Sequence, residues 1–563
     1  MAFFLLCISS LLLFVISYIF QPLVDARRRL PPGPRRLPVI GNLHNIGKNP
    51  HRAFARLADR YGPFVSIRLG GVRAVVATST DAAREILQRH NADIAGRGGL
   101  DSWHACGHHA NSIIALPPRR KWRAMRKLCT EELFTPRRLG ELRAVREEKA
   151  RELARRVSDA NAGGAPVAVA REVFAAVAGV LLRSMFSEDM DAATVRQLRD
   201  VVEEAVVVAG APNLSDYFPV IAAADVMGVR RRMEKLVGWV YGVIDGQIEQ
   251  RRRRRIAGEP RKNDLLDVAL DMEGEVEGEG WVMNRETMRG MFMDLLVAGS
   301  GSTSSTIEWA MAELLENQKS MKKLQEELKG LLGTRTHVAE SDISQLPYLQ
   351  AVIKETLRLH PTVPIAFNKA DATVEIQGYK IPQGTTVYVN IWAICREAKI
   401  WDDPEKFMPE RFLDRDINFL GTNFEFIPFG AGRRICLGMP LAERMLHLML
   451  ASLLLQFDWT ILDEVNGDGL DMTEKFGLVL SMAMPLRAVA KEKSKLMEAK
   501  IWDDPEKFML MPERFLERDI NFLGTNFKFI PFGIGWTTQR PWDAIGRKDA
   551  ASDACIAAAC RFD

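Results

Sequence analysis

Apolar side chains recur at three- and four-residue spacing over five long stretches of the chain, which places them on one face of an α-helix. The stretches are Arg138–Ala160, Val229–Arg255, Arg285–Asn317, Leu346–His360 and Pro440–Phe457. Two shorter regions carry paired β-branched runs instead. One pair lies on either side of Gly70-Gly71, and the other lies between Ile376 and Val389. Glycine and proline interrupt both regions, as in β-hairpins. The pattern predicts a mainly α fold with small β-sheets.

The N-terminal segment Ala2–Phe20 carries no charged residue and consists mostly of large apolar residues. A membrane-spanning helix needs about 20 such residues. A cleaved signal peptide would place basic residues before the apolar run, whereas Arg27-Arg28-Arg29 follow it, and positive flanks stay cytosolic. We therefore expect a single-pass membrane anchor at residues 1–21 and a cytosolic body. Prolines stiffen the segment between them, so residues 22–38 are expected to form a basic, proline-rich hinge.

The body of the chain contains no Pro-, Ser- or Gly-rich linker between Pro50 and Lys493, which favours one large domain at residues 39–493. The seven cysteines are scattered and odd in number, which argues for a reducing compartment. The formal net charge is only +4, so no nucleic-acid partner is expected. Five consecutive arginines at 251–255 favour a solvated helix end, with contact to a membrane surface as the alternative.

An internal repeat occupies the C-terminal part of the chain. The segments 399–408, 409–412 and 418–429 recur, nearly unchanged, at 500–509, 512–515 and 521–532. Where the first copy continues to Arg434 and Cys436, the second has Thr537 and Gln539. Two copies do not make a repeat architecture. We interpret residues 494–563 as a degenerate duplicated tail without a site of its own.

The segment Phe429–Gly438 contains a cysteine in surroundings that suit a thiolate ligand to iron. Metal ligation and the start of the helix predicted from Pro440 both lower the pKa of the Cys436 thiol. A thiolate ligand pushes electron density onto haem iron and favours O–O cleavage. The alternative for a single cysteine is a small buried apolar side chain.

The residue types around Cys436 also suit a haem-binding loop. Gly432 and Gly438 permit tight turns and close approach to a macrocycle. Arg434 can pair with a haem propionate through charge-assisted hydrogen bonds. Phe429 can pack beside the sulfur and limit the access of water. The segment matches Phe-x-x-Gly-x-Arg-x-Cys-x-Gly at every fixed position and resembles the cytochrome P450 signature.

Two further motifs carry the same resemblance. Glu355 and Arg358 are three residues apart and share a helix face. They look like the family's Glu-x-x-Arg helix, which implies a structural contact with Arg411. Trp122 and Arg126 look like the family's Trp-x-x-x-Arg helix, whose polar groups would face the haem propionates. The resemblance runs from about Pro31 to Lys493, and in detail the chain is similar to plant microsomal members, nearest the terpenoid hydroxylases of the geraniol-hydroxylase type.

The resemblance implies a single large haem-thiolate cytochrome P450 fold with haem b, iron protoporphyrin IX, as cofactor. It implies a monooxygenase that hydroxylates a lipophilic small molecule, plausibly a terpenoid, with O2 and electrons from NADPH-cytochrome P450 reductase. It also implies a single-pass location in the endoplasmic reticulum membrane, with the catalytic domain in the cytosol. The metal ligand would be Cys436.

The helix predicted at Arg285–Asn317 departs from the family pattern. Relatives carry Ala/Gly-Gly-x-Asp/Glu-Thr-Thr/Ser there, and this chain has Ala298-Gly299-Ser300-Gly301-Ser302-Thr303. The resemblance places Ala298 and Gly299 against the cofactor and Gly301, Ser302 and Thr303 at the catalytic position. Gly301 replaces the acid of the acid–alcohol pair that relays protons. Asp294 lies on a similar face, but about 10 Å away at ~1.5 Å rise per residue, too far to replace that acid directly.

The segment after His360-Pro361 resembles the family's substrate-facing strand. Val363, Ile365 and Ala366 are the substrate contacts that this implies. The family often continues with Pro-Arg or Pro-His, whereas this chain continues with Asn368-Lys369, so one propionate contact is missing from the pattern.

A short cluster, His104, Cys106, His108 and His109, has the spacing of a zinc site, although clusters of this kind give many false matches. The resemblance places it in the loop above the substrate pocket.

Two other functions stay open at this point. One is a haem-thiolate isomerase or dehydratase that acts on a peroxide, which needs neither a reductase nor the acid–alcohol pair. The unbroken cysteine loop disfavours it. The other is a haem-binding protein with impaired turnover, which Gly301 and the degenerate tail favour.

Overall fold

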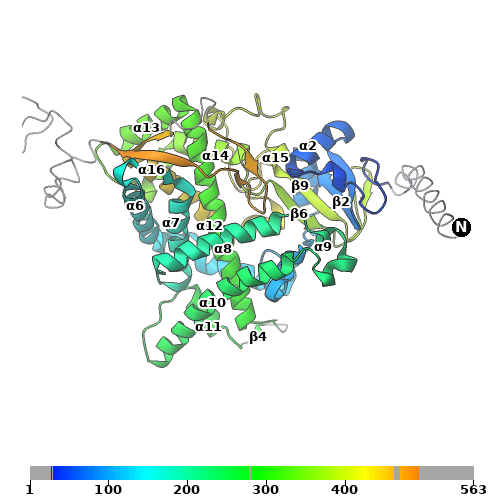
Figure 1. The fold of residues 1–563 in the computed structure, drawn as a ribbon, viewed down its shortest axis with the longest axis horizontal. Coiled ribbons are helices and arrows are strands. Elements are labelled where there is room, and N and C mark those ends of the chain that lie inside the picture. Colours follow the sequence, from blue (N-terminus) through cyan, green and yellow to red (C-terminus); the bar gives the residue numbers. More distant parts are fainter. Residues whose placement is uncertain (1–26, 28, 275, 278–280, 462–469, 494–563) are drawn as a thin grey trace, which may run out of the picture. The chain divides into compact units, whose positions relative to one another are not determined.

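The computed structural model describes residue 27 and residues 29–274, 276–277, 281–461 and 470–493. Most of this chain is helical (Figure 1). The helices are α2 (Pro50–Tyr61), α3 (Thr80–Arg84), α4 (Arg120–Cys129), α5 (Pro136–Glu141), α6 (Arg143–Ala160), α7 (Val169–Phe186), α8 (Ala192–Gly210), α9 (Leu214–Tyr217), α10 (Val229–Ile256), α11 (Leu265–Asp271), α12 (Arg285–Glu316), α13 (Gln318–Leu332), α14 (Pro347–Leu359), α15 (Ile391–Ile394) and α16 (Met439–Gln456).

Short 3-10 helices include η3 (Asp101–Ala110), η6 (Pro219–Ala224), η8 (Pro409–Phe412) and η9 (Gly432–Arg434), the last of which lies within the loop before Cys436. The strands are β1 (Phe64–Leu69), β2 (Val72–Ala77), β3 (Val167–Ala168), β4 (Val276–Glu277), β5 (Trp281–Val282), β6 (Ile365–Lys369), β7 (Val374–Ile376), β8 (Tyr379–Ile381), β9 (Thr386–Asn390), β10 (Phe457–Ile461), β11 (Glu474–Lys475), β12 (Ser481–Met482) and β13 (Arg487–Glu492). The prediction of a mainly α fold with small sheets is confirmed.

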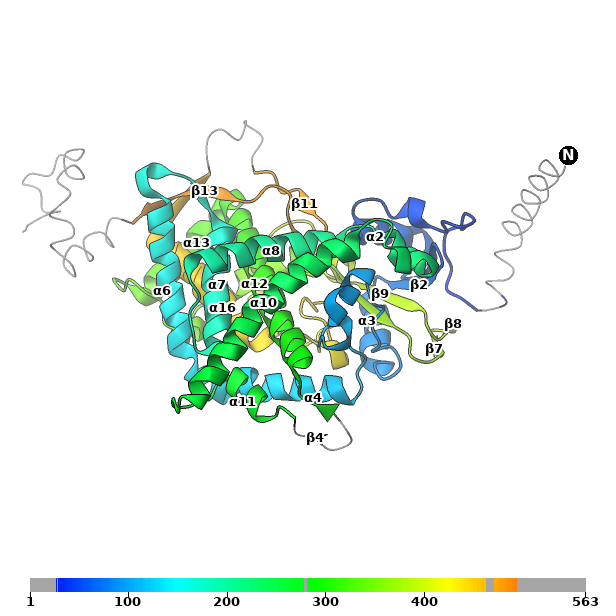
Figure 2. The same cartoon turned by 60° about the horizontal axis from the view of Figure 1, so that its bottom comes forward.

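Helix α12 runs through the middle of the helical part, where α7, α14 and α16 pack against it (Figure 1). Helices α8 and α10 lie against each other, and both contact α12 (Figures 1 and 2). Two glycines let α12 approach its neighbours closely. A Cβ at Gly290 would lie 2.3 Å from the Asn111 carbonyl oxygen, and one at Gly299 would lie 2.9 Å from Leu181 Cδ1 of α7. Helix α12 is therefore held from several sides.

The sheets join segments that are far apart in sequence. The largest has the strand order β1-β2-β9-β6, with β2 and β9 parallel and the other pairs antiparallel. The turn between β1 and β2 is at Gly70-Gly71, as predicted, and Gly70 has φ +58°. The second predicted hairpin is partly wrong. Strands β7 and β8 form a hairpin, but β9 leaves them and pairs with β2 and β6.

The helix predicted at Arg138–Ala160 is two helices in the structure. Helix α5 ends at Glu141, and α6 begins at Arg143, because Leu142 has φ −88° and ψ 5°, outside the helical region. Gly140, in the last turn of α5, weakens the helix there. The apolar spacing continues across this break, so periodicity alone does not reveal it.

The run of arginines at 251–255 does end a helix, but of these five side chains only Arg253 is exposed, so the predicted solvation is wrong for most of the run. Arg251 is 5% exposed and donates to both oxygens of Asp264 at 2.8 Å. Arg252 pairs with Glu273, and Arg255 pairs with Asp267. The last turns of α10 are thus tied to the segment that contains α11, which neutralises most of the charge that suggested a membrane contact.

Within the part of the chain that the structure describes, no helix is both long enough and apolar enough to cross a membrane. The predicted anchor at residues 1–21 and the predicted tail at 494–563 lie outside the described residues.

Candidate haem-thiolate site

The loop before α16 presents Cys436 in a fixed geometry. The Cys436 backbone N–H donates to the Phe429 carbonyl at 2.9 Å, which closes the loop. Gly432 has φ +64°, and a Cβ there would lie 1.9 Å from the Leu87 carbonyl oxygen, so only glycine fits this position. Phe429 packs edge-on against Phe419, with ring centroids 5.2 Å apart. These contacts fix the conformation of the loop on the N-terminal side of Cys436.

The Cys436 sulfur is surrounded by groups that stabilise its anion. Backbone N–H groups of Gly438 and Met439, at the start of α16, hydrogen bond to the sulfur, and the Arg126 guanidinium lies near it. Burial nevertheless raises the pKa of the thiol. The sulfur keeps exposed surface although protein surrounds it closely. A cation bound at that surface would be needed to hold the thiolate at neutral pH.

Gly438 differs from its predicted role. Its φ is −82°, which any residue adopts, and no protein atom lies within 4 Å of the position of a Cβ. Its backbone N–H, not its conformational freedom, contributes to the thiolate site, and the space beside it is open for a cofactor.

Three half-buried arginines gather close to this loop. The guanidinium carbons of Arg126 and Arg434 lie 5.3 and 4.8 Å from the ring centroid of Trp122. Burial, followed by the nearby charges of Arg97 and Arg126, lowers the pKa of Arg434 to about 9; Asp371 offsets this only in part. Burial lowers the pKa of Arg97 to about 10, and its Nε has no hydrogen-bond partner.

No described carboxylate forms an ion pair with Arg97, Arg126 or Arg434. Their contacts are mostly backbone carbonyls: Arg434 donates to Ala95 at 2.9 Å, and Arg126 donates to Ile435 at 2.6 Å. A buried cluster of like charges is costly unless an anionic group balances it. The cluster therefore fits a ligand that carries carboxylates, and Arg97 is a member that sequence reasoning did not identify, because only the fold brings it to the other two.

Trp122 itself does not present its N–H to such a ligand. Its Nε1 donates to the Ile113 carbonyl at 2.9 Å. The Trp122 N–H was expected to contact a propionate, but it donates to the backbone instead. This hydrogen bond holds the indole ring beside the guanidinium groups of Arg126 and Arg434.

The middle of α12 carries the predicted distal residues. Ala298 is exposed although Leu296 and Ser300 beside it are fully buried. The Ser302 hydroxyl donates to the Ala298 carbonyl at 2.6 Å, and the Thr303 hydroxyl donates to the Gly299 carbonyl at 2.8 Å. Hydroxyl groups bonded in this way still accept hydrogen bonds through their oxygens. Ser302, which is partly exposed, can therefore hold a water or a ligand group beside Ala298.

Gly301 places no side chain at the position of the acid, although there is space for a Cβ. A Cβ at Gly301 would meet only Val202 Cγ1 of α8, at 3.5 Å, which is ordinary contact. Asp294 does not take over. It accepts from His108 Nε2 at 3.0 Å, from the Ser112 hydroxyl at 2.8 Å and from the Ile114 backbone N–H at 3.2 Å. Its oxygens bind the 108–114 segment to α12.

The His/Cys cluster in η3 is not a metal site. His108 is held between Asp294 and the Tyr241 hydroxyl, which lies 2.9 Å from its Nδ1, and the Cys106 sulfur contacts the Glu234 carbonyl. The described chain contains no group of three or more His, Cys, Asp or Glu side chains arranged for a metal ion. The zinc alternative is wrong because no three of these side chains converge. The rings of His104 and His109 lie 4.1 Å apart, but the backbone turns at Cys106 and Gly107, both with positive φ.

The charged residues of the Glu-x-x-Arg motif meet in a fully buried cluster. Arg358 donates to both Glu355 oxygens at 2.7 and 2.8 Å, and Arg411 of η8 donates to Glu355 at 3.1 Å. Arg358 also donates to the carbonyls of Cys395, Pro404 and Lys406. The cluster fixes the loop around η8 on α14, in the polypeptide that leads to Cys436.

The predicted substrate-facing residues surround the start of β6. Val363 is 37% exposed, Ala366 is partly buried, and Ile365 is only 8% exposed. Phe367 packs against Trp103 of η3, with ring centroids 5.5 Å apart. Arg97 Nη1 donates to the Phe367 carbonyl and to Asn368 Oδ1. Asn368 thus positions an arginine of the cluster, which compensates for the basic residue absent from this strand.

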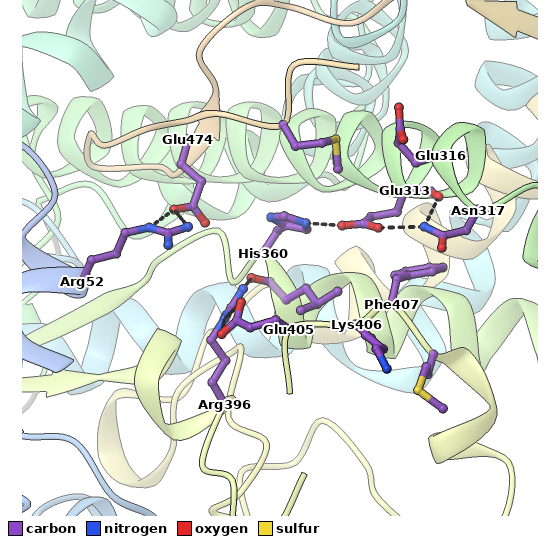
Figure 3. A pocket seen from close by; sticks show the side chains of 13 residues that line it. Arg52, Glu313, Glu316, Asn317, His360, Arg396, Glu405, Lys406, Phe407 and Glu474 are labelled. Atoms are coloured by element: carbon purple, nitrogen blue, oxygen red, sulfur yellow. Dashed lines mark hydrogen bonds and ion pairs between the residues drawn. The ribbon is translucent and has the colours of Figure 1, made fainter. Parts of the chain in front are cut away.

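A cavity of about 530 Å³ lies elsewhere, at the C-terminal end of α12 (Figure 3). His360 lies in it, 2.7 Å from Glu313 and stacked on Trp309 with ring centroids 3.9 Å apart. Its lining is Arg52, Glu313, Glu316, Asn317, Leu359, His360, Arg396, Glu405, Lys406, Phe407, Met408, Met472 and Glu474. It includes no residue of the cysteine loop or of Ala298–Thr303, so its charged groups belong to structural ion pairs and not to the site of Cys436.

The cysteine loop, the arginine cluster and the exposed middle of α12 fit one group: a flat metal macrocycle with two carboxylates. The class that this defines is a haem-thiolate protein. Comparison with known proteins agrees. The profile of the family "Cytochrome P450" matches residues 31–484 and 494–537, so its second match lies in the repeated tail. The chain belongs to the cytochrome P450 family, and its cofactor is haem b.

The chain is similar to plant members over most of its length. It is 41% identical to "Cytochrome P450 76C4" of Arabidopsis thaliana, over 82% of this chain and 92% of that protein. It is 41% identical to "Geraniol 8-hydroxylase" of Swertia mussotii, over 82% and 94%. It is 38% identical to "Ferruginol synthase" of Salvia miltiorrhiza, over 83% and 95%. The protein is therefore a monooxygenase that works with a redox partner on a lipophilic substrate.

Proposed function

We propose that this protein hydroxylates a terpenoid, with O2 and with electrons that NADPH-cytochrome P450 reductase delivers. The similarity over more than nine tenths of the length of a geraniol 8-hydroxylase and a ferruginol synthase carries this proposal. We also propose that residues 1–21 anchor the chain in the endoplasmic reticulum membrane. Their uncharged, apolar composition, followed by a basic hinge, supports this location.

Haem, when bound, supplies the iron at which dioxygen is reduced. Cys436 would be its thiolate ligand, with the Gly438 and Met439 N–H groups and Arg126 holding the negative charge on the sulfur. These groups weaken the basicity of the sulfur without protonating it, which tunes the ligand. Phe429 packs beside the loop that presents the sulfur and limits the access of water to it.

The cluster of Arg97, Arg126 and Arg434 would hold the propionates. Guanidinium groups bind carboxylates through charge-assisted hydrogen bonds, and the unpartnered Nε of Arg97 provides one donor directly. The negative charge of the propionates would offset the burial and the repulsion that lower the pKa of Arg434. Cofactor binding and local stability are therefore coupled.

On the distal side, Ser302 would hold a proton at its hydroxyl and orient water beside Ala298. Val363 and Ala366 would contact the apolar substrate, and Trp103 and Phe367 would close the adjacent wall. The absence of a carboxylate at Gly301 removes the usual proton relay. This favours a second candidate, a haem-binding protein with impaired turnover.

One experiment tests the proposal and separates the alternatives. Microsomes that contain this protein and the reductase are incubated with NADPH and a panel of terpenoids, and products are analysed. NADPH-dependent hydroxylated product, absent with Cys436→Ser, is the expected result. The reduced, carbonyl-bound protein should show the red-shifted Soret band of a thiolate complex, and Cys436→Ser should lose it.

An intact thiolate band without product would support impaired turnover instead. Product formed without NADPH from a hydroperoxide would support the isomerase or dehydratase. Retention of the thiolate band by Cys436→Ser would remove Cys436 as the ligand.

A further inference from the structure

Glu308 is a buried carboxylate on α12 that no part of the site described above uses. Its side chain is 4% exposed, and one of its oxygens accepts from the Leu486 backbone N–H at 2.9 Å. No described arginine, lysine or histidine forms an ion pair with it. A buried acid without a cationic partner is costly as an anion, so such a group calls for an explanation.

The position of Glu308 on α12 connects it with Gly301. The two are seven residues apart, about 10 Å along the helix at ~1.5 Å per residue, so Glu308 cannot act there without an intermediate. Ser304 lies between them, and all three are on one face of the helix. This face is turned towards α8. A Cβ at Gly301 would contact Val202 there, and Glu203 of α8 is close enough for its charge to act on Glu308. The Ser304 hydroxyl lies 3.0 Å from the Ser300 carbonyl and 3.1 Å from the Gly301 carbonyl, to which it can donate, and its oxygen can still accept a hydrogen bond.

The same face reaches solvent at α8. Glu203 is exposed, and Arg199 Nε lies 3.5 Å from it. Burial, with a smaller contribution from Glu203, raises the pKa of Glu308 to about 7, while the Leu486 N–H opposes the shift. A carboxyl with a pKa near 7 can both take up and release protons at neutral pH, as a relay group must.

The other buried carboxylates of α12, Asp294 and Glu313, already form hydrogen bonds with nearby side chains. Asp294 holds His108, Ser112 and Ile114, and Glu313 lies 2.7 Å from His360. Glu313 also lies on a different face of the helix from Gly301. Glu308 is thus the carboxylate on this helix whose burial, neighbours and orientation fit proton transfer.

We propose that Glu308 stores and relays the protons that an acid at position 301 supplies in relatives, along the Glu203–Glu308–Ser304 face of α12 to the vacant side-chain position at Gly301. This rests on the proposed monooxygenase function. Each turnover joins one O2, two electrons and two protons with the substrate to give one alcohol and one water. The reductase supplies the electrons. Glu308 gives up a proton towards the position beside Gly301 through Ser304 and water, and it regains one from solvent on the Glu203 side, so it is unchanged after each cycle.

The test compares Glu308→Gln with Glu313→Gln, a matched variant of a paired carboxylate on the same helix. Infrared spectra of the resting, substrate-free protein are recorded across neutral pH. We expect a protonated-carboxyl band that disappears as pH rises through about 7, is missing in Glu308→Gln and remains in Glu313→Gln. No such titrating band in the unsubstituted protein, or its survival in Glu308→Gln, would overturn the assignment.

The relay is measured with the reductase and NADPH in the absence of substrate, as peroxide released per NADPH oxidised, and with substrate as product per NADPH. Glu308→Gln should raise the peroxide fraction and slow product formation roughly 10²-fold, the lower end of what general acid catalysis contributes. Adding Gly301→Asp to Glu308→Gln should reverse both changes. Glu308→Asp, which keeps the acid, serves if the Gln variant does not retain haem, and it should titrate and couple nearly as the unsubstituted protein does.

The two proposals fail differently. If no terpenoid is hydroxylated but the peroxide fraction responds to Glu308→Gln and to Gly301→Asp, the substrate assignment is wrong and the relay stands. If product forms and neither ratio changes with Glu308→Gln, the function stands and the relay is wrong.

Discussion

Gly301 is the residue at which the distal helix differs most from its relatives' pattern, and the structure makes it replaceable. Because a Cβ there would meet only Val202 at 3.5 Å, the first side-chain carbon of an aspartate fits without displacing α8. Its carboxylate would stand beside the Ser302 hydroxyl and add a short proton path. We expect Gly301→Asp to raise the ratio of hydroxylated product to NADPH oxidised. Gly301→Asn, of the same size but unable to release a proton in this way, is the control, and an equal gain with Asn would contradict the prediction.

Arg358 depends on the shape of its guanidinium group as well as on its positive charge. Its guanidinium donates to both oxygens of Glu355 and to three backbone carbonyls, in a cluster with no exposed surface. Lysine keeps the charge but has a single nitrogen and cannot reproduce the two-pronged contact. We expect Arg358→Lys to destabilise the fold by about 1–3 kcal/mol, the cost of leaving buried acceptors without a donor.

The measurement is the urea midpoint of the haem-loaded protein, followed by the Soret band. Arg84→Lys is the control, because Arg84 forms a surface pair with Asp81 at 3.1 Å and its replacement should change stability by less than about 1 kcal/mol. Equal midpoints for the two variants would show that charge, not geometry, is what Arg358 supplies.

At the scale of the element, α12 contains two glycines that differ in the space around them: Gly290 is closely packed, and Gly301 is not. A Cβ at Gly290 would lie 2.3 Å from the Asn111 carbonyl oxygen, part of the backbone, which cannot yield as a flexible side chain would. We expect Gly290→Ala to destabilise the protein by at least about 1–3 kcal/mol, as overpacking does. Gly301→Ala meets no such obstacle and should stabilise the helix by up to about 1 kcal/mol. Thermal unfolding of both variants checks the pair, and the prediction fails if Gly290→Ala is tolerated as well as Gly301→Ala.

The elements themselves were predictable where their determinants are local. The periodicity of Arg285–Asn317 gives α12 to within a residue, and Gly70-Gly71 marks the first turn. The break at Leu142 and the departure of β9 from its hairpin were not predictable, because tertiary contacts decide them.

The same distinction applies to the site. Cys436 is visible in a ten-residue motif, so the sequence is sufficient to find it. Arg97 is distant in sequence from Arg126 and Arg434, and only the fold joins them. Glu308 differs from many other glutamates only in its burial, which no local pattern expresses. The arginines at 251–255 looked exposed because their partners, such as Asp264 and Asp267, lie beyond the end of the helix.

At the scale of the whole molecule, the described fold ends where its last sheet is complete. Strand β13 pairs with β10 and β3, and the Lys493 N–H donates to the Gln456 carbonyl at 3.1 Å. We expect a chain that stops after Lys493 to bind haem and to unfold in the same way as the full chain. A chain that stops after Leu486 lacks β13 and should lose haem. Haem content per chain after purification measures both, and loss of haem from the longer of the two would show that residues 494–563 take part in the fold.

The pairing of β2 with β9 has a consequence for how the chain acquires its structure. Ala74–Ala77 pair with Thr386–Val389, and Val167 pairs with Ala488, so two sheets join segments separated by some three hundred residues. Contacts of such long range close slowly, because the loop between them must first lose its conformational freedom. Until Thr386 has been synthesised, the β1–β2 hairpin has an open edge, and open edges pair with other chains. A nascent chain halted before this point would therefore be prone to aggregation, and the time between the synthesis of β2 and that of β9 is when assistance by chaperones would matter most.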